Sequence, residues 1–398
     1  KPLYAAGLCL IANTAPVAFG AVGIPIIAMS NLVGVEQYQV SAMVGRMLVP
    51  LSLTVPFFIV FLMDGVKGVK ETFPAILVAA VSFTGTQFLS SNFLGAELPD
   101  IASAVVSLAC TTIFLKFWKV KNVFRLDDVK DFTNHSKLSL GVVLKAWLPF
   151  ILLIACIVVW TQDWFKAFFK KGSVFDYTQV TMVFKNMESA IQNAAGNAVN
   201  LDLAFNLIAL QGGTAILLAA VLTILFLRIK LNVVEEALGD TLKEMAIPCI
   251  TIGLVVAFAF ISRNSGMSET LGRAFAESGN AFAFFSPIVG WLGVFITGSD
   301  TSSNLLFGTL QQVSAQQLGI KEALFLAANS VGGVVGKMIS PQSIAIACAA
   351  VGLVGRESEL FRFTLKYSIG FILIIGVWTA IIALFLNGII PDIVPLAK

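Results

Sequence analysis

Long apolar runs, separated by a few short polar stretches, limit most strongly how this chain can fold. A membrane-spanning helix needs about 20 mostly apolar residues, and roughly ten segments qualify as spans or parts of spans. Only 12% of the 398 residues are charged, against about 25% in soluble domains. The sequence therefore predicts an all-α integral membrane protein with many spans. The expected segments are residues 3–31 (broken), 40–63, 72–93, 98–118, 146–161, 213–227, 246–262, 282–319 (broken), 323–353 and 367–386.

Composition excludes several other classes of protein. The net charge of +3 is small, and no run of Lys or Arg predicts nucleic-acid binding. The five cysteines form no CxxC pair, and the single histidine, His135, cannot build a multi-histidine zinc site. The string GGVVGKM (332–338) is one residue too short between its glycines for a nucleotide-binding loop. We therefore expect no catalytic residues, no metal and no cofactor.

The polar stretches indicate how the chain is oriented. Residues 119–145 are rich in Lys and Arg, and 228–244 begins with Arg228 and Lys230. Basic loops tend to stay on the cytoplasmic side, so we expect both stretches there, together with 64–71, and we expect 163–210 outside. The side of 355–366 stays open, because an inverted repeat would place it opposite 64–71, yet both segments are basic.

Two pairs of short strings indicate an internal repeat. NTAPVAFG (13–20) is followed by GRMLVPLS (45–52), and late in the chain TSSNLLFG (301–308) is followed by GKMISPQS (336–343). The spacing agrees as well, since Gly20 precedes Gly45 by 25 residues and Gly308 precedes Gly336 by 28. Two repeats with glycine and proline breaks at matching positions are typical of transporters with discontinuous helices.

The repeat predicts how the chain is divided. We expect a first transport repeat at 1–118, a loop, one span and an external segment at 119–212, and a second transport repeat at 213–398. Three spans precede the motif in the second repeat, but only about a dozen residues precede it in the first. We therefore expect at least two further spans before Lys1 in the full-length protein.

Three charged residues stand alone within long uncharged stretches: Arg46, Asp300 and Lys337. An ionisable group at membrane depth costs several kcal/mol, so each of them predicts a functional site. Arg46 and Lys337 occupy equivalent repeat positions, and each lies four residues before a proline. We expect the two cations to converge on one anionic substrate, although either could instead reach the membrane surface along its aliphatic stem.

Asp300 lies in the polar string TGSDTSSN between two apolar runs. The string could be a surface turn between two ordinary spans, or the tip of a re-entrant hairpin within the membrane. The repeat favours the tip, where Asp300 would be desolvated and could carry a coupled proton. We expect the substrate hydroxyl to meet polar side chains of the two tips, namely Asn13, Thr14, Thr301, Ser302, Ser303 and Asn304. We expect Glu97 and Asp100 to form a turn between spans.

Long, unusual strings carry a resemblance to a known family. ITGSDTSSNLLFGTLQ, VGGVVGKMISPQSIAIACAA and NTAPVAFGAVGIPI closely resemble the bacterial lactate permease family, and MDGVKGVKETFPA, ELPDIAS and VGRESELFRFTLK fit it as well. The resemblance implies proton-coupled uptake of L-lactate, D-lactate and glycolate at the cytoplasmic membrane. It also implies an all-helical fold similar to the ion-transporter superfamily with paired hairpins, and members that are longer at the N-terminus. It assigns no binding residues.

The alternative within the same class is a sodium-coupled carboxylate carrier, because Asn, Ser and Thr at the tips also suit Na⁺. An intramembrane enzyme finds no support in paired carboxylates, His/Cys ligands or a Ser/His arrangement. A passive channel is less favoured, because the repeat predicts alternating access. The sequence does not indicate the oligomeric state.

Overall fold

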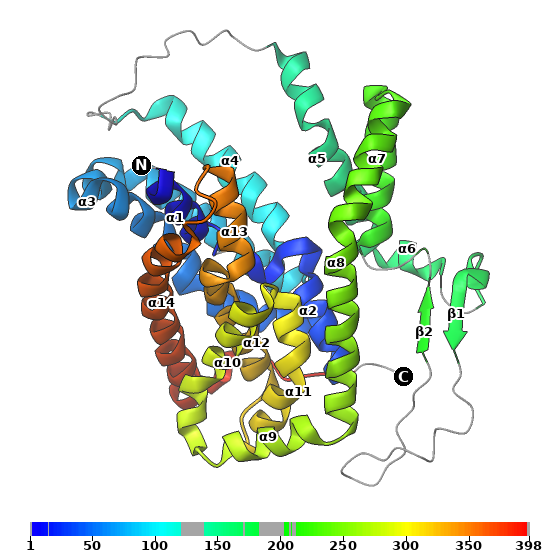
Figure 1. Ribbon diagram of the computed structural model, residues 1–398, viewed down its shortest axis with the longest axis vertical. Helices are drawn as coiled ribbons and strands as arrows, with labels where there is room; N and C mark the ends of the chain where they lie inside the picture. The colour runs from blue at the N-terminus through cyan, green and yellow to red at the C-terminus, as the bar shows by residue number, and fades with distance from the viewer. Residues whose placement is uncertain are drawn as a thin grey trace. The chain divides into compact units, whose positions relative to one another are not determined.

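The computed structural model describes residues 2–14, 16–120, 139–169, 172–182, 203–206, 208 and 212–395 (Figure 1). His135 and most of the basic stretch 119–145 lie outside the described residues. Contacts divide the chain into two units, Lys1–Phe124 with Ile252–Lys398, and Arg125–Thr251. This division follows spatial contacts, so the division by repeats at 118 and 213 stays a prediction.

Within the described part, seven helical spans are long and apolar enough to cross a membrane. This confirms an all-α, multi-pass membrane protein. Shorter apolar helices lie between them: α1 (Pro2–Ala12), α2 (Gly20–Val33), α7 (Gly213–Leu227) and α13 (Pro341–Ala350). The long spans contain α3 (Gln37–Phe93), α4 (Pro99–Phe117), α5 (Leu140–Thr161), α8 (Leu231–Asn264), α10 (Phe282–Thr297), α12 (Glu322–Gly336) and α14 (Glu357–Phe385).

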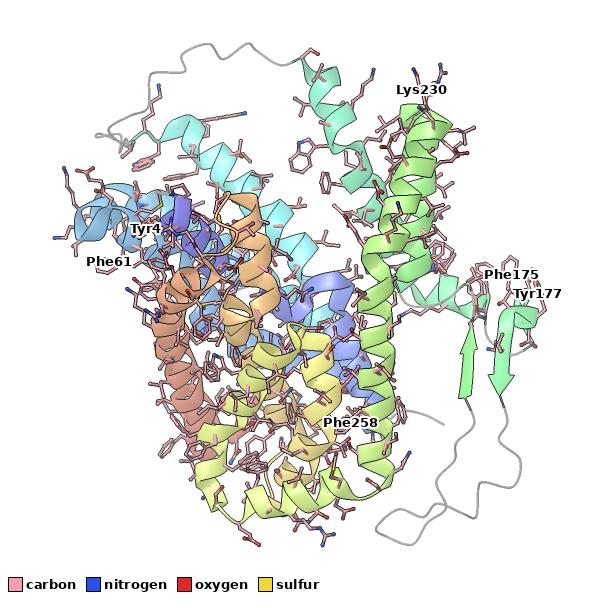
Figure 2. All side chains as sticks on the ribbon, in the orientation of Figure 1. Tyr4, Phe61, Phe175, Tyr177, Lys230 and Phe258 are labelled. Atoms are coloured by element: carbon pink, nitrogen blue, oxygen red, sulfur yellow. The ribbon has the colours of Figure 1, made fainter. Side chains whose placement is uncertain are left out.

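Large apolar side chains cover the outer surface of these helices. Phe61 on α3 and Phe258 on α8 are about half exposed (Figure 2). Ile296 on α10 and Phe385 on α14 are more exposed still. In water such a surface would be unfavourable, whereas lipid tails are as apolar as these side chains. The outward-facing residues therefore fit a hydrocarbon environment.

The chain leaves helical geometry inside two predicted broken segments. In the first, α1 ends at Ala12 and α2 begins at Gly20; in the other, α10 ends at Thr297 and α11 (Asp300–Leu318) begins two residues after Gly298. Gly298 adopts a left-handed conformation (φ 72°) that a side chain rarely takes. The two predicted breaks are confirmed. Their depth in a membrane stays a prediction.

Several predicted boundaries are wrong. The helix α14, for example, begins at Glu357, ten residues before the expected span 367–386. Only Asp64 and Gly65 leave helical geometry in the expected loop 64–71, because the long side chains of Lys67 and Lys70 allow the helix to continue. The polar stretch 228–244 is helical from Leu231, since its acidic and basic residues favour a helix. The expected long helix 323–353 is broken at Ser340, where extended backbone precedes Pro341, a residue that cannot continue a helix but readily begins one.

Glycines bring α10 and α12 into backbone contact. A Cβ atom at Gly290 would lie less than 3.0 Å from the backbone of Asn329, and one at Gly332 equally close to Pro287. Gly336, one turn beyond Gly332 on α12, faces the backbone of α10 in the same way. This spacing of small residues lets membrane helices approach closely. The GGVVG string is thus a packing motif of α12.

Aromatic contacts bring two basic segments to the same end of the first unit. The ring of Tyr4 on α1 packs edge-on against Phe363 at 5.5 Å between centroids, and its hydroxyl donates a hydrogen bond to the Leu62 carbonyl. Phe58 and Tyr367 pack at 5.4 Å. Residues 64–71 and 355–366 therefore lie at the same end, which is not the arrangement that an inverted repeat gives for these segments.

The second unit pairs α5 with α7. The Trp160 indole on α5 donates a hydrogen bond to the Thr214 hydroxyl on α7 at 3.0 Å. A short helix, α6 (Asp163–Ala167), and a two-stranded antiparallel ladder of β1 (Gln179–Met182) and β2 (Leu203–Asn206) lie between them in sequence. These elements fall in the segment 163–210, whose external location stays a prediction.

Candidate functional site

A carboxyl group lies buried at the break between α10 and α11. Ser299 begins α11 as its N-cap, and its hydroxyl accepts a hydrogen bond from the Ser302 amide. The next residue, Asp300, is only 4% exposed, so its side chain points into the protein. A helix N-terminus favours a negative charge, which makes this position suitable for a group that exists in both charged and neutral forms.

The two carboxyl oxygens of Asp300 have different surroundings. Oδ2 accepts a hydrogen bond from the Ser330 hydroxyl at 2.8 Å and a long one from the Asn304 amide at 3.5 Å. Oδ1 is buried without a hydrogen-bond partner and faces Gly333, where a Cβ atom would collide with it. A buried carboxylate with one unpaired oxygen is costly, and protonation of Oδ1 would remove its negative charge.

Neutral polar side chains extend from Asp300 through the interior. Asn329 donates to Asn304 at 2.9 Å, and Gln311 donates to Asn329 at 3.1 Å. The Ser286 hydroxyl donates to Gln311 at 2.8 Å, and Asn304 donates to Ser330 at 3.2 Å. Each of these bonds runs toward Asp300, and the Gln311 amide also donates back to the Ser286 carbonyl at 2.9 Å. We call the set the polar network: Ser286, Asn304, Gln311, Asn329, Ser330 and Asp300, all but Asp300 fully buried.

Four members of the polar network were not predicted as site residues: Ser286, Gln311, Asn329 and Ser330. The sequence carried a signal for three of them. Gln311 follows Asp300 and Asn304 at positions i, i+4 and i+11, which share one helix face. Asn329 and Ser330 interrupt an otherwise apolar span, which also marks them.

Lys337 lies at the turn between α12 and α13, close to Asp300. It begins a 3₁₀ turn, η4 (Lys337–Ile339), and its ammonium donates a hydrogen bond to the Gly298 carbonyl at 2.6 Å. That carbonyl is at the C-terminal end of α10, where a cation is favoured. Lys337 and Asp300 also attract each other electrostatically. Two of the three isolated charges are thus brought together.

Arg46 has a different set of neighbours. Its Nε donates to the Asn92 side chain at 2.9 Å, and its Nη1 donates to the Ile389 carbonyl beyond the end of α14. These partners share no residue with those of Lys337. The predicted convergence of the two cations on one substrate is not visible among these contacts, and it stays a prediction.

The remaining predicted residues are divided between the two breaks. Ser303 is buried and its hydroxyl donates to the Gly290 carbonyl at 3.0 Å, whereas Thr301 is half-buried. Thr14 is buried and its hydroxyl donates to the Leu10 carbonyl of α1 at 3.5 Å, and Asn13 is exposed. The helix that follows the first break, α2, contacts the polar network, because Asn304 donates to the Pro25 carbonyl at 3.2 Å.

A pair of acidic side chains lies outside the polar network, where α3 is followed by α4. Glu97 is in the predicted turn and accepts a hydrogen bond from Gln37 at 3.2 Å. Asp100 is in the first turn of α4, where it is hydrogen-bonded to Gln87, and Gln87 in turn accepts from the Ser52 hydroxyl at 2.7 Å. The Gln87 side chain thus joins Asp100 on α4 to Ser52 on α3.

These features define a multi-pass helical membrane protein with a buried carboxyl group in a polar interior, as found in proteins that move solutes across membranes. The chain belongs to the L-lactate permease family, because the family's model matches residues 1–386. The resemblance seen in the motifs is thereby confirmed.

Individual relatives agree with the family assignment. The chain is 50% identical over 403 residues to the L-lactate permease of Escherichia coli strain K12, covering 98% of this chain and 73% of the relative. It is 46% identical over 407 residues to the glycolate permease GlcA of the same strain, with the same coverage. It is 46% identical over 401 residues to the L-lactate permease of Bacillus subtilis strain 168, covering 95% and 71%. No solved structure shows a significant match.

Proposed function

We propose that this chain is a secondary active transporter that carries L-lactate, D-lactate and glycolate across the bacterial cytoplasmic membrane by proton symport. Membership of the L-lactate permease family and the printed names of the relatives, which include a glycolate permease, support the substrate class. D-lactate and proton coupling come from the family resemblance. Permeases are transporters, so no enzymatic activity is part of the proposal.

The buried Asp300 is the observation that carries proton coupling. Its Oδ2 is occupied by two neutral donors, which leaves Oδ1 as the atom to receive the proton. A neutral Asp300 removes one negative charge from the interior, so that a substrate carboxylate can enter without adding to the net charge. Release of the proton to the cytoplasm would then favour release of the substrate.

The substrate contacts are also part of the proposal. Lys337 would exchange the Gly298 carbonyl for the lactate carboxylate, as a mobile ammonium can. Arg46 would grip a carboxylate in two places once it leaves Asn92 and Ile389. The tip residues, Asn13, Thr14 and 301–304, would bind the hydroxyl, and their arrangement must change during the cycle for both tips to contribute.

The architecture that we propose consists of two transport repeats, 1–118 and 213–398, with re-entrant breaks similar to those of the ion-transporter superfamily. We place the end of the first unit that holds 64–71 and 355–366 on the cytoplasmic side. Lys67, Lys70, Arg356 and Arg362 gather there, and Lys and Arg favour that side.

Uptake of radiolabelled L-lactate into proteoliposomes tests the proposal. An imposed pH gradient, acid outside, should drive accumulation at zero sodium, and glycolate and D-lactate should compete. Accumulation driven by a sodium gradient at fixed pH, with no response to the pH gradient, would replace protons by Na⁺ as the coupling ion. Absence of lactate counterflow under all gradients would reject the substrate class.

A further inference from the structure

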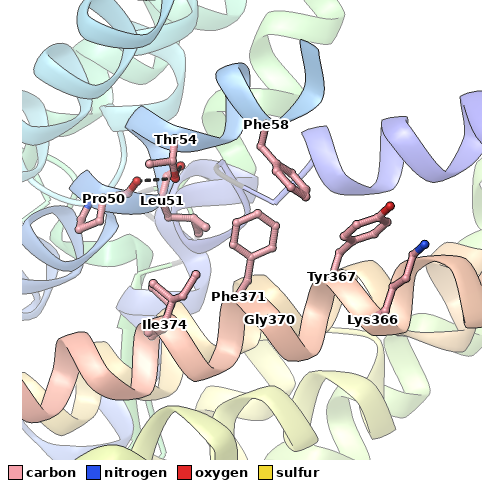
Figure 3. A pocket seen from close by; sticks show the side chains of 10 residues that line it. Pro50, Leu51, Thr54, Phe58, Lys366, Tyr367, Gly370, Phe371 and Ile374 are labelled. Atoms are coloured by element: carbon pink, nitrogen blue, oxygen red, sulfur yellow. Dashed lines mark hydrogen bonds between the residues drawn. The ribbon is translucent and has the colours of Figure 1, made fainter. Parts of the chain in front are cut away.

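A groove of about 440 Å³ lies between α3 and α14, apart from the polar network (Figure 3). Its volume is in the range of small-molecule sites, roughly 300–1,000 Å³. Pro50, Leu51 and Phe58 of α3 face Phe371 and Ile374 of α14 across it. Phe58 packs edge-on against Phe371 at 5.2 Å between ring centroids. The body of the groove is therefore hydrocarbon.

The groove does not suit a hydroxy acid. Apart from Tyr367 beside Lys366, Thr54 is the uncharged polar side chain of the lining, and its hydroxyl already donates to the Pro50 carbonyl at 2.7 Å. A lactate hydroxyl bound there would lose its hydrogen bonds to water without replacement, which is unfavourable. A hydrocarbon chain makes no hydrogen bonds to water, so it loses none when it enters the groove.

One end of the groove carries a fixed positive charge. The ammonium of Lys366 lies 4.6 Å from the ring centroid of Tyr367 and 5.3 Å from that of Phe363, within the range of cation–π attraction. Its side chain is exposed, and among the described residues no carboxylate forms an ion pair with it. The aromatic rings thus hold an uncompensated cation at the mouth of an apolar groove.

The position of Lys366 along α14 fits the headgroup region of a leaflet. It lies nine residues after Glu357, the first residue of α14, or about 14 Å along the helix at 1.5 Å per residue. Lysine near the end of a spanning helix extends toward the interface. Arg362, one turn earlier, is exposed as well, and such basic clusters attract anionic lipids.

We infer that the groove between α3 and α14 binds one anionic phospholipid, with an acyl chain along the apolar walls and the phosphate on Lys366. The occupant is a lipid because the walls are hydrocarbon and the chain spans a membrane. The lipid is anionic because, of the described residues that line the groove, Lys366 is the charged one, and it lies at the mouth. The inference does not depend on the transported substrate.

Gly370 offers a way to close the groove without disturbing the fold. It lines the groove one turn after Lys366, and a Cβ atom built on it meets no atom within 4 Å. Gly370→Leu should therefore place a side chain in the space of the acyl chain. Lys70, an exposed lysine at the same end but outside the groove lining, supplies a matched control for charge.

Native mass spectrometry of the purified full chain, titrated with phosphatidylglycerol or phosphatidylethanolamine, tests the inference. The wild-type protein should keep one phosphatidylglycerol at detergent concentrations that remove other lipid. Lys366→Ala should weaken its binding about fivefold, since one lysine contributes about that factor, and Gly370→Leu should abolish it. Lys70→Ala should bind as the wild type does, and phosphatidylethanolamine should bind more weakly.

The inference is overturned if the wild-type protein retains no phosphatidylglycerol beyond general lipid, or if Lys366→Ala and Lys70→Ala lose it equally. Equal binding of the two lipids would also overturn it. Thermal unfolding of each variant in detergent identifies any variant that has lost its fold, and Gly370→Ala then replaces Gly370→Leu as the milder obstruction.

Discussion

Gly333 faces the Asp300 carboxyl group so closely that a Cβ atom at position 333 would lie less than 3.0 Å from Oδ1. The buried acid and the glycine on the neighbouring helix therefore depend on each other. A larger residue at 333 would displace Asp300 from the Ser330 hydroxyl, and the surrounding helices leave it little room to move.

Gly333→Ala should lower the stability of the protein. Overpacking in a tight interior costs about 1–3 kcal/mol, so we expect a lower midpoint of thermal unfolding in detergent, measured by intrinsic fluorescence. Gly85→Ala is the control, because a Cβ atom there meets no atom within 4 Å. An unchanged midpoint for Gly333→Ala would mean that α11 and α12 are packed less tightly than described.

Asp300→Asn should separate exchange from accumulation. An amide keeps the size of the side chain but cannot bind or release the coupled proton, so exchange of internal for external lactate should persist while a pH gradient no longer drives uptake. Counterflow and gradient-driven uptake in proteoliposomes measure the two. Glu359→Gln, an exposed residue paired with Arg356 at 2.7 Å, should behave as the wild type. Normal accumulation by Asp300→Asn would end its assignment as the proton carrier.

Lys337→Ala should impair transport less when Asp300 is already neutral. The ammonium and the carboxyl attract each other, so loss of either partner changes what the other contributes. We expect the KM of counterflow to rise in Lys337→Ala, and the rise to be smaller in the Asp300→Asn background. Independent effects in the double-mutant cycle would show that the two groups act separately.

Arg46→Ala should raise the KM for lactate about tenfold or more, since a charge-assisted hydrogen bond contributes about 1.5–3 kcal/mol. Asn92→Ala removes only the observed partner of Arg46 and should affect KM little. Counterflow at several lactate concentrations gives both values. If the two variants raised KM equally, Arg46 would act by holding Asn92 rather than by binding substrate.

Asn329→Leu should destabilise the protein through its neighbours. It would leave the Asn304 oxygen without its donor and remove one of the two acceptors of the Gln311 amide, which keeps the Ser286 carbonyl, and a buried unsatisfied group costs about 1–3 kcal/mol. Thermal unfolding in detergent checks the loss. Gln317→Leu, on the exposed face of α11, is the control and should unfold at a temperature near that of the wild type.

The spans and the breaks could be predicted because each leaves a local signal. A run of apolar residues predicts a spanning helix, and TGSD, with its left-handed glycine, predicts the end of one. At Gly65 the sequence predicts a longer loop, because Lys67 and Lys70 are residues typical of a solvent-exposed segment. The structure has only a kink there, since the long side chains of these lysines can extend to water while the helix continues.

The candidate site was predicted only in part, since its contacts join distant helices. Asp300 and Lys337 could be predicted because each is the lone charge in a long uncharged stretch, and the structure brings both to one break. Asn329 and Ser330 belong to the same site through helix packing between α11 and α12, which no local pattern specifies. Repeat equivalence linked Arg46 to Lys337, yet Arg46 lies within continuous helix and Lys337 at a turn.

The glycine contacts between α10 and α12 restrict which parts can rearrange during a transport cycle. With the backbone of Asn329 against Gly290 and that of Pro287 against Gly332, these two helices cannot slide past each other without a steric clash. They must move as one rigid body. The movement that opens the site to either side must then occur at Gly298 and Ser340, which flank these helices and where the backbone already departs from helical geometry.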